Sequence, residues 1–184
     1  MGLFELFAAA VVADLLFVLS LATHELGHAL AASALRLKVL RIWAGNGPEI
    51  LRIRKFELRL FPILGGTEIA GGLAKAPLRA RVITSLAGPG ASLVTAGGFT
   101  LVAHAVMPAM AAPLRTMAVA NLALAVFNLL PVPPLDGWLA LEPVLERAGW
   151  VRLTASQRDR VYRAGMVAIL VAIVAFFAFR QLFG

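Results

Sequence analysis

The sequence predicts an α-helical polytopic membrane protein with about four transmembrane helices and a small membrane-associated β-hairpin or sheet between the first two. The chain of 184 residues is 60% hydrophobic, and its mean hydropathy of +0.86 exceeds what a soluble domain needs. Four long apolar stretches cover about residues 3–35, 82–107, 114–130 and 161–180. Residues 39–69 are more polar, and no repeat or long linker divides the chain. We therefore expect residues 1–184 to form a single intramembrane domain.

The first apolar stretch, residues 3–35, ends in the pattern His24-Glu25-Leu26-Gly27-His28. At about 1.5 Å per residue it is longer than the hydrocarbon core of about 30 Å, so the helix must tilt or protrude. Its first charged residue is Glu5 rather than a basic residue, which indicates a retained span and not a cleaved signal peptide. Asp14 lies near the middle of the span, either as a group close to the site or as an acid paired with a neighbouring helix.

The segment that follows is basic and strand-like. Residues 36–81 hold ten of the seventeen lysines and arginines, which places this loop in the cytoplasm and both termini outside. Apolar and charged side chains alternate over residues 51–54 and 56–60, a pattern typical of strands. A turn is expected at Gly45-Asn46-Gly47-Pro48, and the strands should end near Pro62 and Gly65-Gly66. The result is a hairpin or three-stranded sheet at the membrane surface, unless the segment is a mere connector.

The net charge of +7 does not indicate nucleic-acid binding. The basic residues lie between apolar spans, where they report membrane topology and attraction to anionic lipid headgroups. We therefore expect the lipid bilayer, and no nucleic acid, as a partner.

Prolines and glycines interrupt the second and third spans. Gly88-Pro89-Gly90 should kink or break the second helix and allow close helix contact. His104, near the far end of that span, is expected to be an interfacial or packed histidine. After the third span the prolines of residues 131–134 require irregular backbone, which at membrane depth must be buried in protein or line a wet cavity. Asp136 should then emerge on the same side of the membrane as His24. Residues 138–148 resume a helical pattern before a basic interfacial segment and the last span.

These residues suggest a catalytic metal site. His24 and His28 are four apart and share one face of a helix. Because the chain has no cysteine, the remaining ligand must be a histidine, an acid or water, and Asp136 completes a set of three with one open position. Zinc suits this set, one ion per chain, although other divalent ions accept the same ligands. Glu25 lies where it could take a proton from an attacking water, so the expected reaction is peptide hydrolysis.

The motifs resemble those of the site-2 protease family of intramembrane zinc metalloproteases. The resemblance rests on the HExxH pattern at 24–28, on Asn128-Leu129-Leu130-Pro131-Val132-Pro133-Pro134-Leu135-Asp136-Gly137, on the 45–48 and 61–66 segments, and on Ala87-Gly88-Pro89. It implies zinc ligands at His24, His28 and Asp136, a catalytic base at Glu25, and an active-site role for Asn128. Ser92 stands where many members carry asparagine. The chain would be a minimal form with four spans and without PDZ or nucleotide-sensing domains.

The expected function is zinc-dependent endopeptidase cleavage of a single-span membrane protein or leftover signal peptide near the cytoplasmic side, as in regulated intramembrane proteolysis. The location would be the plasma membrane of a prokaryote. Two alternatives are a membrane metal-binding or transport protein and a non-proteolytic homologue.

Substrate helices must unwind before cleavage, since their peptide groups are hydrogen-bonded. An unwound segment could pair with the strands of residues 49–61. The candidate substrate-positioning residues are Leu51, Ile53, Phe56, Leu58, Gly65 and Gly66.

Overall fold

The computed structural model describes residues 2–183 as five α-helices, one 3₁₀ turn and a two-stranded sheet. In chain order these elements are α1 (Leu3–Ala34), β1 (Val39–Ile53), β2 (Phe56–Ile69), the 3₁₀ turn (Leu73–Lys75), α2 (Leu78–Ala105), α3 (Pro108–Asn128), α4 (Asp136–Arg147) and α5 (Ala155–Phe183).

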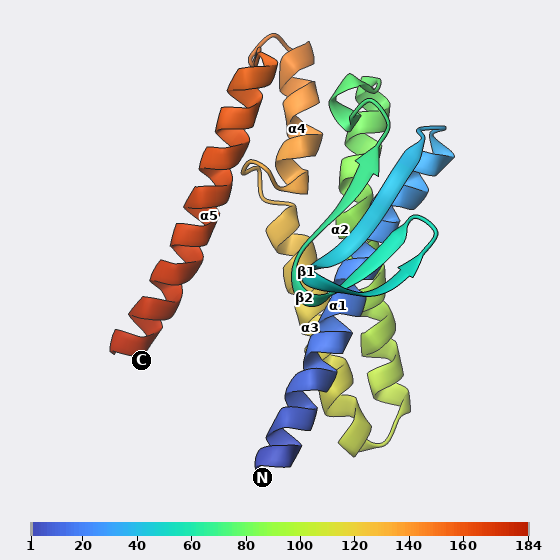
Figure 1. The fold of residues 1–184 in the computed structure, drawn as a ribbon, viewed down its shortest axis with the longest axis vertical. Coiled ribbons are helices and arrows are strands. Elements are labelled where there is room, and N and C mark those ends of the chain that lie inside the picture. Colours follow the sequence, from blue (N-terminus) through green and yellow to red (C-terminus); the bar gives the residue numbers. More distant parts are fainter. Residues whose placement is uncertain (1, 184) are drawn as a thin grey trace.

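Helices α1, α2 and α3 form the central bundle, and the hairpin of β1 and β2 lies against α1 (Figure 1). Gly27 on α1 allows the close approach of α2, because a Cβ at this position would lie 2.7 Å from the Cβ of Ala91. Helix α2 runs unbroken through Pro89, so the predicted break does not occur. The short helix α4 packs on α2, and α5 descends at an angle away from the bundle (Figure 1).

Within the described residues, three helices are long and apolar enough to cross a membrane: residues Asp14–Ala34 of α1, all of α2, and Ala155–Gln181 of α5. The third predicted span, residues 114–130, is the helix α3, but no described stretch of α3 is both long and apolar enough to count among these candidates. It carries Arg115, Asn121 and Asn128 along its length, and polar side chains of this kind lower the hydropathy of a span. The prediction of four spans is therefore confirmed for three of them.

The sheet occupies residues 39–69, as predicted, but the strands are longer than their sequence patterns suggest. The segment 45–48 is a bend inside β1 and not a turn before it, with positive φ at Gly45 (89°) and Gly47 (78°). Likewise β2 does not end at Pro62 but continues to Ile69.

Because both strands bend, residues 42–44 of β1 pair with 65–67 on one side and 56–58 on the other. Residues 51–53 then pair with 56–58. The segment 65–69 thus lies at one edge of the sheet and 49–53 at the other. Residues 56–58, including Leu58, are paired on both sides.

A buried polar cluster attaches α5 to α4 and α2. Glu142 is fully buried and accepts hydrogen bonds from Arg158 Nε (2.6 Å) and Tyr162 Oη (2.5 Å). Glu146 pairs with Arg158 and, at 2.5 Å, with Arg81 of α2. A buried carboxylate is tolerated only when it is paired in this way. Beyond this cluster and the Gly165–Pro133 contact, α5 is largely exposed (Figure 1).

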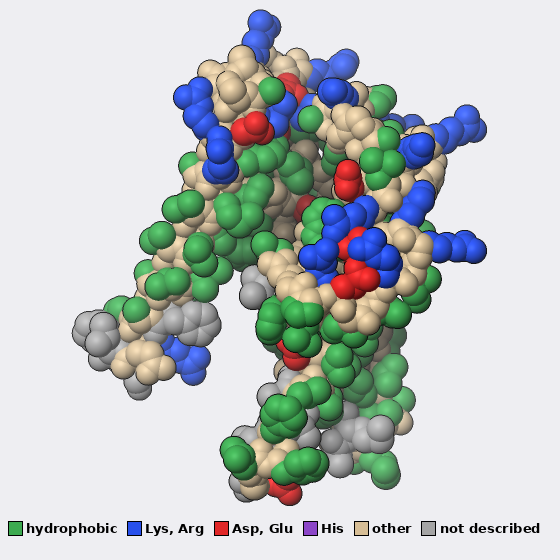
Figure 2. Space-filling model, in the orientation of Figure 1, with side chains coloured by type: hydrophobic (Ala, Val, Ile, Leu, Met, Phe, Trp, Pro, Cys, Tyr) green, Lys and Arg blue, Asp and Glu red, His purple; other side chains and the backbone are tan. Residues whose placement is uncertain are grey.

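Charged and apolar surfaces are separated along the molecule. Figure 2 shows Lys and Arg side chains gathered over the upper end and over the hairpin, and hydrophobic side chains over the lower helices. On the hairpin, Arg41, Arg52 and Arg59 all pair with the buried carboxylate of Glu57, at 2.6, 3.1 and 3.0 Å. The Arg41 hydrogen bond holds the pKa of Glu57 below its usual value. The pairing of Glu57 with these arginines therefore stabilises the folded protein at pH values above the pKa that Glu57 has in the unfolded chain. This stabilisation is lost as the pH falls through the lower pKa that Glu57 has in the folded protein.

Candidate metal centre

Three side chains from two helices converge in the interior of the protein. The Nε2 atom of His24 lies 3.0 Å from Oδ2 of Asp136, and Nε2 of His28 lies 3.3 Å from the same oxygen. The two Nε2 atoms are 3.3 Å apart. The histidines come from α1, and Asp136 is the first residue of α4. The sequence prediction that these three residues meet is confirmed, and their atoms are close enough together to hold one metal ion.

Helix α2 fixes the orientation of both imidazole rings. Nδ1 of His28 donates a hydrogen bond of 2.7 Å to the backbone carbonyl of Thr84. Since a carbonyl can only accept, Nδ1 carries a proton, and Nε2 is the nitrogen that faces Asp136 and would bind a metal ion. Nδ1 of His24 lies 2.9 Å from Oγ of the fully buried Ser92. Two imidazole nitrogens and one carboxylate are a ligand set that fits a catalytic zinc site, which leaves one position open.

Gly88 makes room for the two imidazole rings. A Cβ at this position would overlap Nε2 of His28 and lie 2.8 Å from Nε2 of His24. Thr84, Gly88 and Ser92 are spaced by four residues and therefore share one face of α2. That face is the wall against which the histidines are held.

The Gly88→Ala variant is expected to bind zinc at least about tenfold more weakly than the wild type, because the added methyl group displaces both ligand rings. Gly90→Ala is the matched control, since nothing lies within 4 Å of a Cβ at Gly90. Zinc content after dialysis against a graded chelator measures the difference. Equal zinc retention in the two variants would contradict this account of Gly88.

Glu25 is buried beside the histidines and contacts the hairpin. Oγ1 of Thr67, on β2, lies 3.2 Å from Oε2 of Glu25 and 3.0 Å from its backbone carbonyl. A Cβ at Gly65 would lie 2.7 Å from Oε1 of Glu25. A side chain at residue 65 would therefore force the carboxylate of Glu25 to shift from its place between α1 and β2. Among the predicted substrate-positioning residues, Gly65 lies against the carboxylate of Glu25.

The other predicted positioning residues lie in different environments. Leu51 and Ile53 are 45% and 57% exposed. Phe56 and Leu58 pack against the core formed by Leu21, Ala22 and Ala44. The ring of Trp43 lies against Gly66 on the face of the sheet away from Glu25.

Asn128 ends α3, and its amide donates a hydrogen bond of 2.9 Å to the carbonyl of Leu124 in the same helix. Among the described residues no hydrogen bond joins it to His24, His28 or Asp136. Its predicted role in the active site remains a prediction.

The structure also gives the positions of three further residues that the sequence analysis named. Ser92 contacts His24, as described above. His104 is exposed and bonds to the carbonyl of Thr100 at 2.7 Å, away from the other two histidines. Asp14 is half-buried and ten residues before His24 on α1, a rise of about 15 Å along a helix. Neither His104 nor Asp14 belongs to the metal centre.

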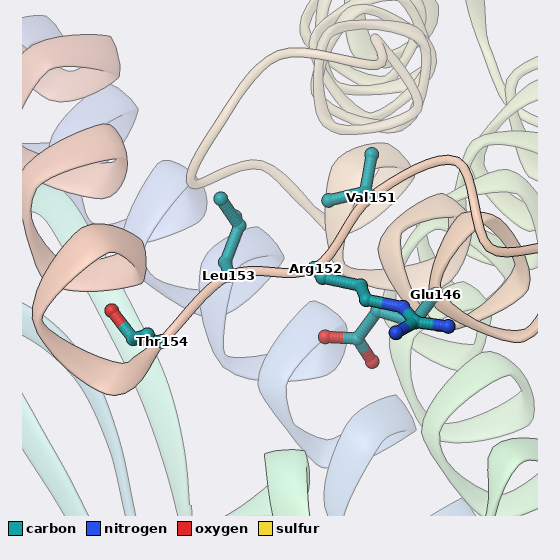
Figure 3. A pocket seen from close by; sticks show the side chains of 5 residues that line it. All are labelled: Glu146, Val151, Arg152, Leu153 and Thr154. Atoms are coloured by element: carbon teal, nitrogen blue, oxygen red, sulfur yellow. The ribbon is translucent and has the colours of Figure 1, made fainter.

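A shallow cavity at the α4–α5 connection is separate from this centre (Figure 3). Its lining residues are Glu146, Val151, Arg152, Leu153 and Thr154. None of them is a candidate ligand or base.

The fold and the site together define a membrane protein with a buried His-His-Asp group that could hold a metal ion, and with an adjacent glutamate. The family model of peptidase family M50 matches residues 12–109 and 101–173. The chain belongs to peptidase family M50.

Two other proteins are similar to this chain. A protein of Synechocystis sp. named as a zinc metalloprotease is 31% identical over 156 residues, which are 83% of this chain and 35% of the relative. The chain thus spans about a third of the length of that relative. The solved structure of the site-2 protease from Methanocaldococcus jannaschii is similar with a TM-score of 0.59, over 92% of this chain and 68% of that one. At 23% identity this likeness shows a shared fold.

Proposed function

We propose that the protein is a zinc-dependent endopeptidase that cleaves transmembrane proteins inside the membrane. The observation that carries this proposal is the convergence of His24, His28 and Asp136 beside the buried carboxylate of Glu25, on a helix apolar enough to span a bilayer. Ionisable residues at membrane depth are costly, and they usually serve function. Membership of family M50 supports the same activity.

Each residue has a role in this chemistry. His24, His28 and Asp136 would hold one zinc ion, which supplies a positive charge that acidifies water and polarises a peptide carbonyl. Glu25 would take the proton from the attacking water and pass it to the leaving amine. Ser92 and the carbonyl of Thr84 keep the two imidazole rings in place. Asn128 is proposed to bind the substrate backbone or the developing oxyanion.

We place the site toward the cytoplasmic side of a prokaryotic plasma membrane, with both termini outside. This orientation rests on the basic residues around the hairpin and the α4–α5 connection, which are attracted to the cytoplasmic side. In this arrangement α3 is the third of four spans, because the chain enters it from α2 at one end and continues to α4 from the opposite end (Figure 1).

The substrate would be a single-span protein or leftover signal peptide bound in extended form. A strand can be added only where a sheet has a free edge. Residues 56–58 are paired on both sides, whereas residues 65–69 pair with β1 on one side alone within the described chain. Gly65 and Thr67 also contact Glu25. Residues 49–53 form the other edge of the sheet, and the segments 42–44 and 56–58 separate them from the edge that contacts Glu25. We therefore assign substrate pairing to the 65–69 edge instead of the strands of residues 49–61.

Edge pairing predicts that backbone amides of the substrate matter. A peptide inhibitor with N-methyl groups on alternate amides should bind at least about tenfold more weakly than its unmethylated parent, since each methyl group removes a ladder hydrogen bond. The same peptide methylated on the other set of amides is the control, because those amides point away from the sheet. Equal inhibition by all three peptides would rule out edge pairing.

The proposed activity is tested in native membranes by comparing the wild type with Glu25→Gln. We expect quantitative proteomics to detect at least one single-span membrane protein that accumulates in the variant. The cleaved fragment of that protein should be present only in the wild type. An identical proteome for both strains, with zinc bound in both proteins, would instead favour a metal-binding or transport role.

A further inference from the structure

Thr67 stands between the free edge of the sheet and the carboxylate of Glu25. Its hydroxyl lies within hydrogen-bond distance of two acceptors on one residue, the side-chain Oε2 at 3.2 Å and the backbone carbonyl at 3.0 Å. A hydroxyl carries one hydrogen and donates it to one acceptor at a time. When the hydroxyl donates to Oε2, that oxygen of Glu25 is held toward β2, while Oε1 lies against Gly65.

The backbone N–H and C=O groups of Thr67 point away from β1. Thr67 lies across from Ile42 in the antiparallel ladder. The N–H of Ile42 donates to Lys55 on the far side at 2.8 Å, so Ile42 and Thr67 form a pair without mutual hydrogen bonds. In such a pair the N–H and C=O groups of both residues point outward. Those of Thr67 therefore point to the free edge, while its side chain points to Glu25.

On this basis, and resting on the proposed function, we infer that Thr67 is a positioning residue for the catalytic base. Its hydroxyl orients the carboxylate of Glu25, and its backbone offers a pairing site to an extended substrate. One residue thus sets the position of the substrate chain relative to the group that moves the proton. A misplacement of about 1 Å in such an arrangement can lower a rate by about a hundredfold.

The simpler role for this hydroxyl is structural, a bond to the α1 carbonyl that holds the hairpin against the helix. The two roles differ in what the Thr67→Val variant does. Valine keeps the shape, the β-branching and the backbone N–H, and removes only the hydroxyl. A structural role affects stability, whereas a positioning role affects turnover at unchanged substrate binding.

The experiment uses the full chain in detergent with fluorescein-labelled casein, an unfolded protein, as the cleavage probe. Thr67→Val is expected to lower kcat by about 10- to 100-fold with KM within about twofold and zinc content unchanged. Thr67→Ser, which restores the hydroxyl, should stay within about threefold of the wild type. Thr100→Val is the matched control, since it removes a hydroxyl that bonds only within α2, to the carbonyl of Ala96.

A second measurement does not depend on activity. In the Co²⁺-loaded protein, the visible absorption bands should shift in Thr67→Val and not in Thr67→Ser or Thr100→Val, because a released Glu25 carboxylate changes the surroundings of the metal. If the wild type fails to cleave casein, the proposed function fails and the Co²⁺ spectra still decide the role of Thr67. Unchanged kcat and unchanged spectra in Thr67→Val would overturn the inference, as would loss of zinc. Should Thr67→Val not fold, Thr67→Ala removes the same hydroxyl with less bulk.

Discussion

The Glu25→Gln variant is expected to cleave at least about a hundredfold, and up to about ten-thousandfold, more slowly than the wild type while it keeps its zinc. Positioned general bases contribute rate factors of this size. Glutamine has the same shape and still accepts a hydrogen bond from Thr67 through its amide oxygen. It cannot take a proton from water. The rate loss would therefore report proton transfer alone.

Turnover of fluorescein-labelled casein by the purified proteins, together with their zinc content, measures this effect. Glu49→Gln is the matched control, because Glu49 is an exposed acid on the same hairpin and lies outside the 65–69 edge. Its turnover should equal that of the wild type. Glu25→Gln with wild-type turnover would refute the role assigned to Glu25.

The Asp136→Ala variant is expected to bind zinc more than about a hundredfold more weakly and to lose detectable cleavage. Loss of a group that only orients a ligand costs about 10- to 100-fold in metal affinity, so loss of a ligand should cost more. Asp136 also lies within 3.3 Å of both histidines, so that its removal leaves a gap in the centre.

Zinc stoichiometry after dialysis against a competing chelator tests this prediction. Asp159→Ala removes an exposed acid near the start of α5 and should retain zinc like the wild type. If Asp136→Ala retained one zinc per chain at the same affinity, Asp136 would not be a ligand.

The metal centre was predictable from the sequence because its residues carry strong local signals. The spacing of His24 and His28 fixes their common helix face. The prolines before Asp136 end a helix on the matching side of the membrane. The contact between these distant residues follows from topology, which charge and hydropathy patterns specify well in a membrane protein.

The hairpin was predicted less well, because pairing in a sheet is set by residues far apart in sequence. Alternation of side chains identified the strands but not the bend in β1 that brings residues 42–44 between two segments of β2. The edge beside Glu25 is therefore the 65–69 segment, and the glycines expected to end β2 lie within it. Thr67 has no distinctive motif. The four-residue spacing of Thr84, Gly88 and Ser92 could have predicted that these three residues share one face of α2.

The metal centre also has a consequence for biosynthesis. Asp136 follows His24 by 112 residues, and the groups that orient both histidines belong to a third helix, α2. A growing chain that has inserted only α1 carries the histidine pair without the carboxylate or the wall that holds the rings. The ribosome must synthesise the start of α4 before all three candidate ligands are present in one chain. Under the proposed function, a partly synthesised chain is therefore unable to attack neighbouring membrane proteins, and the order of translation itself delays the onset of activity.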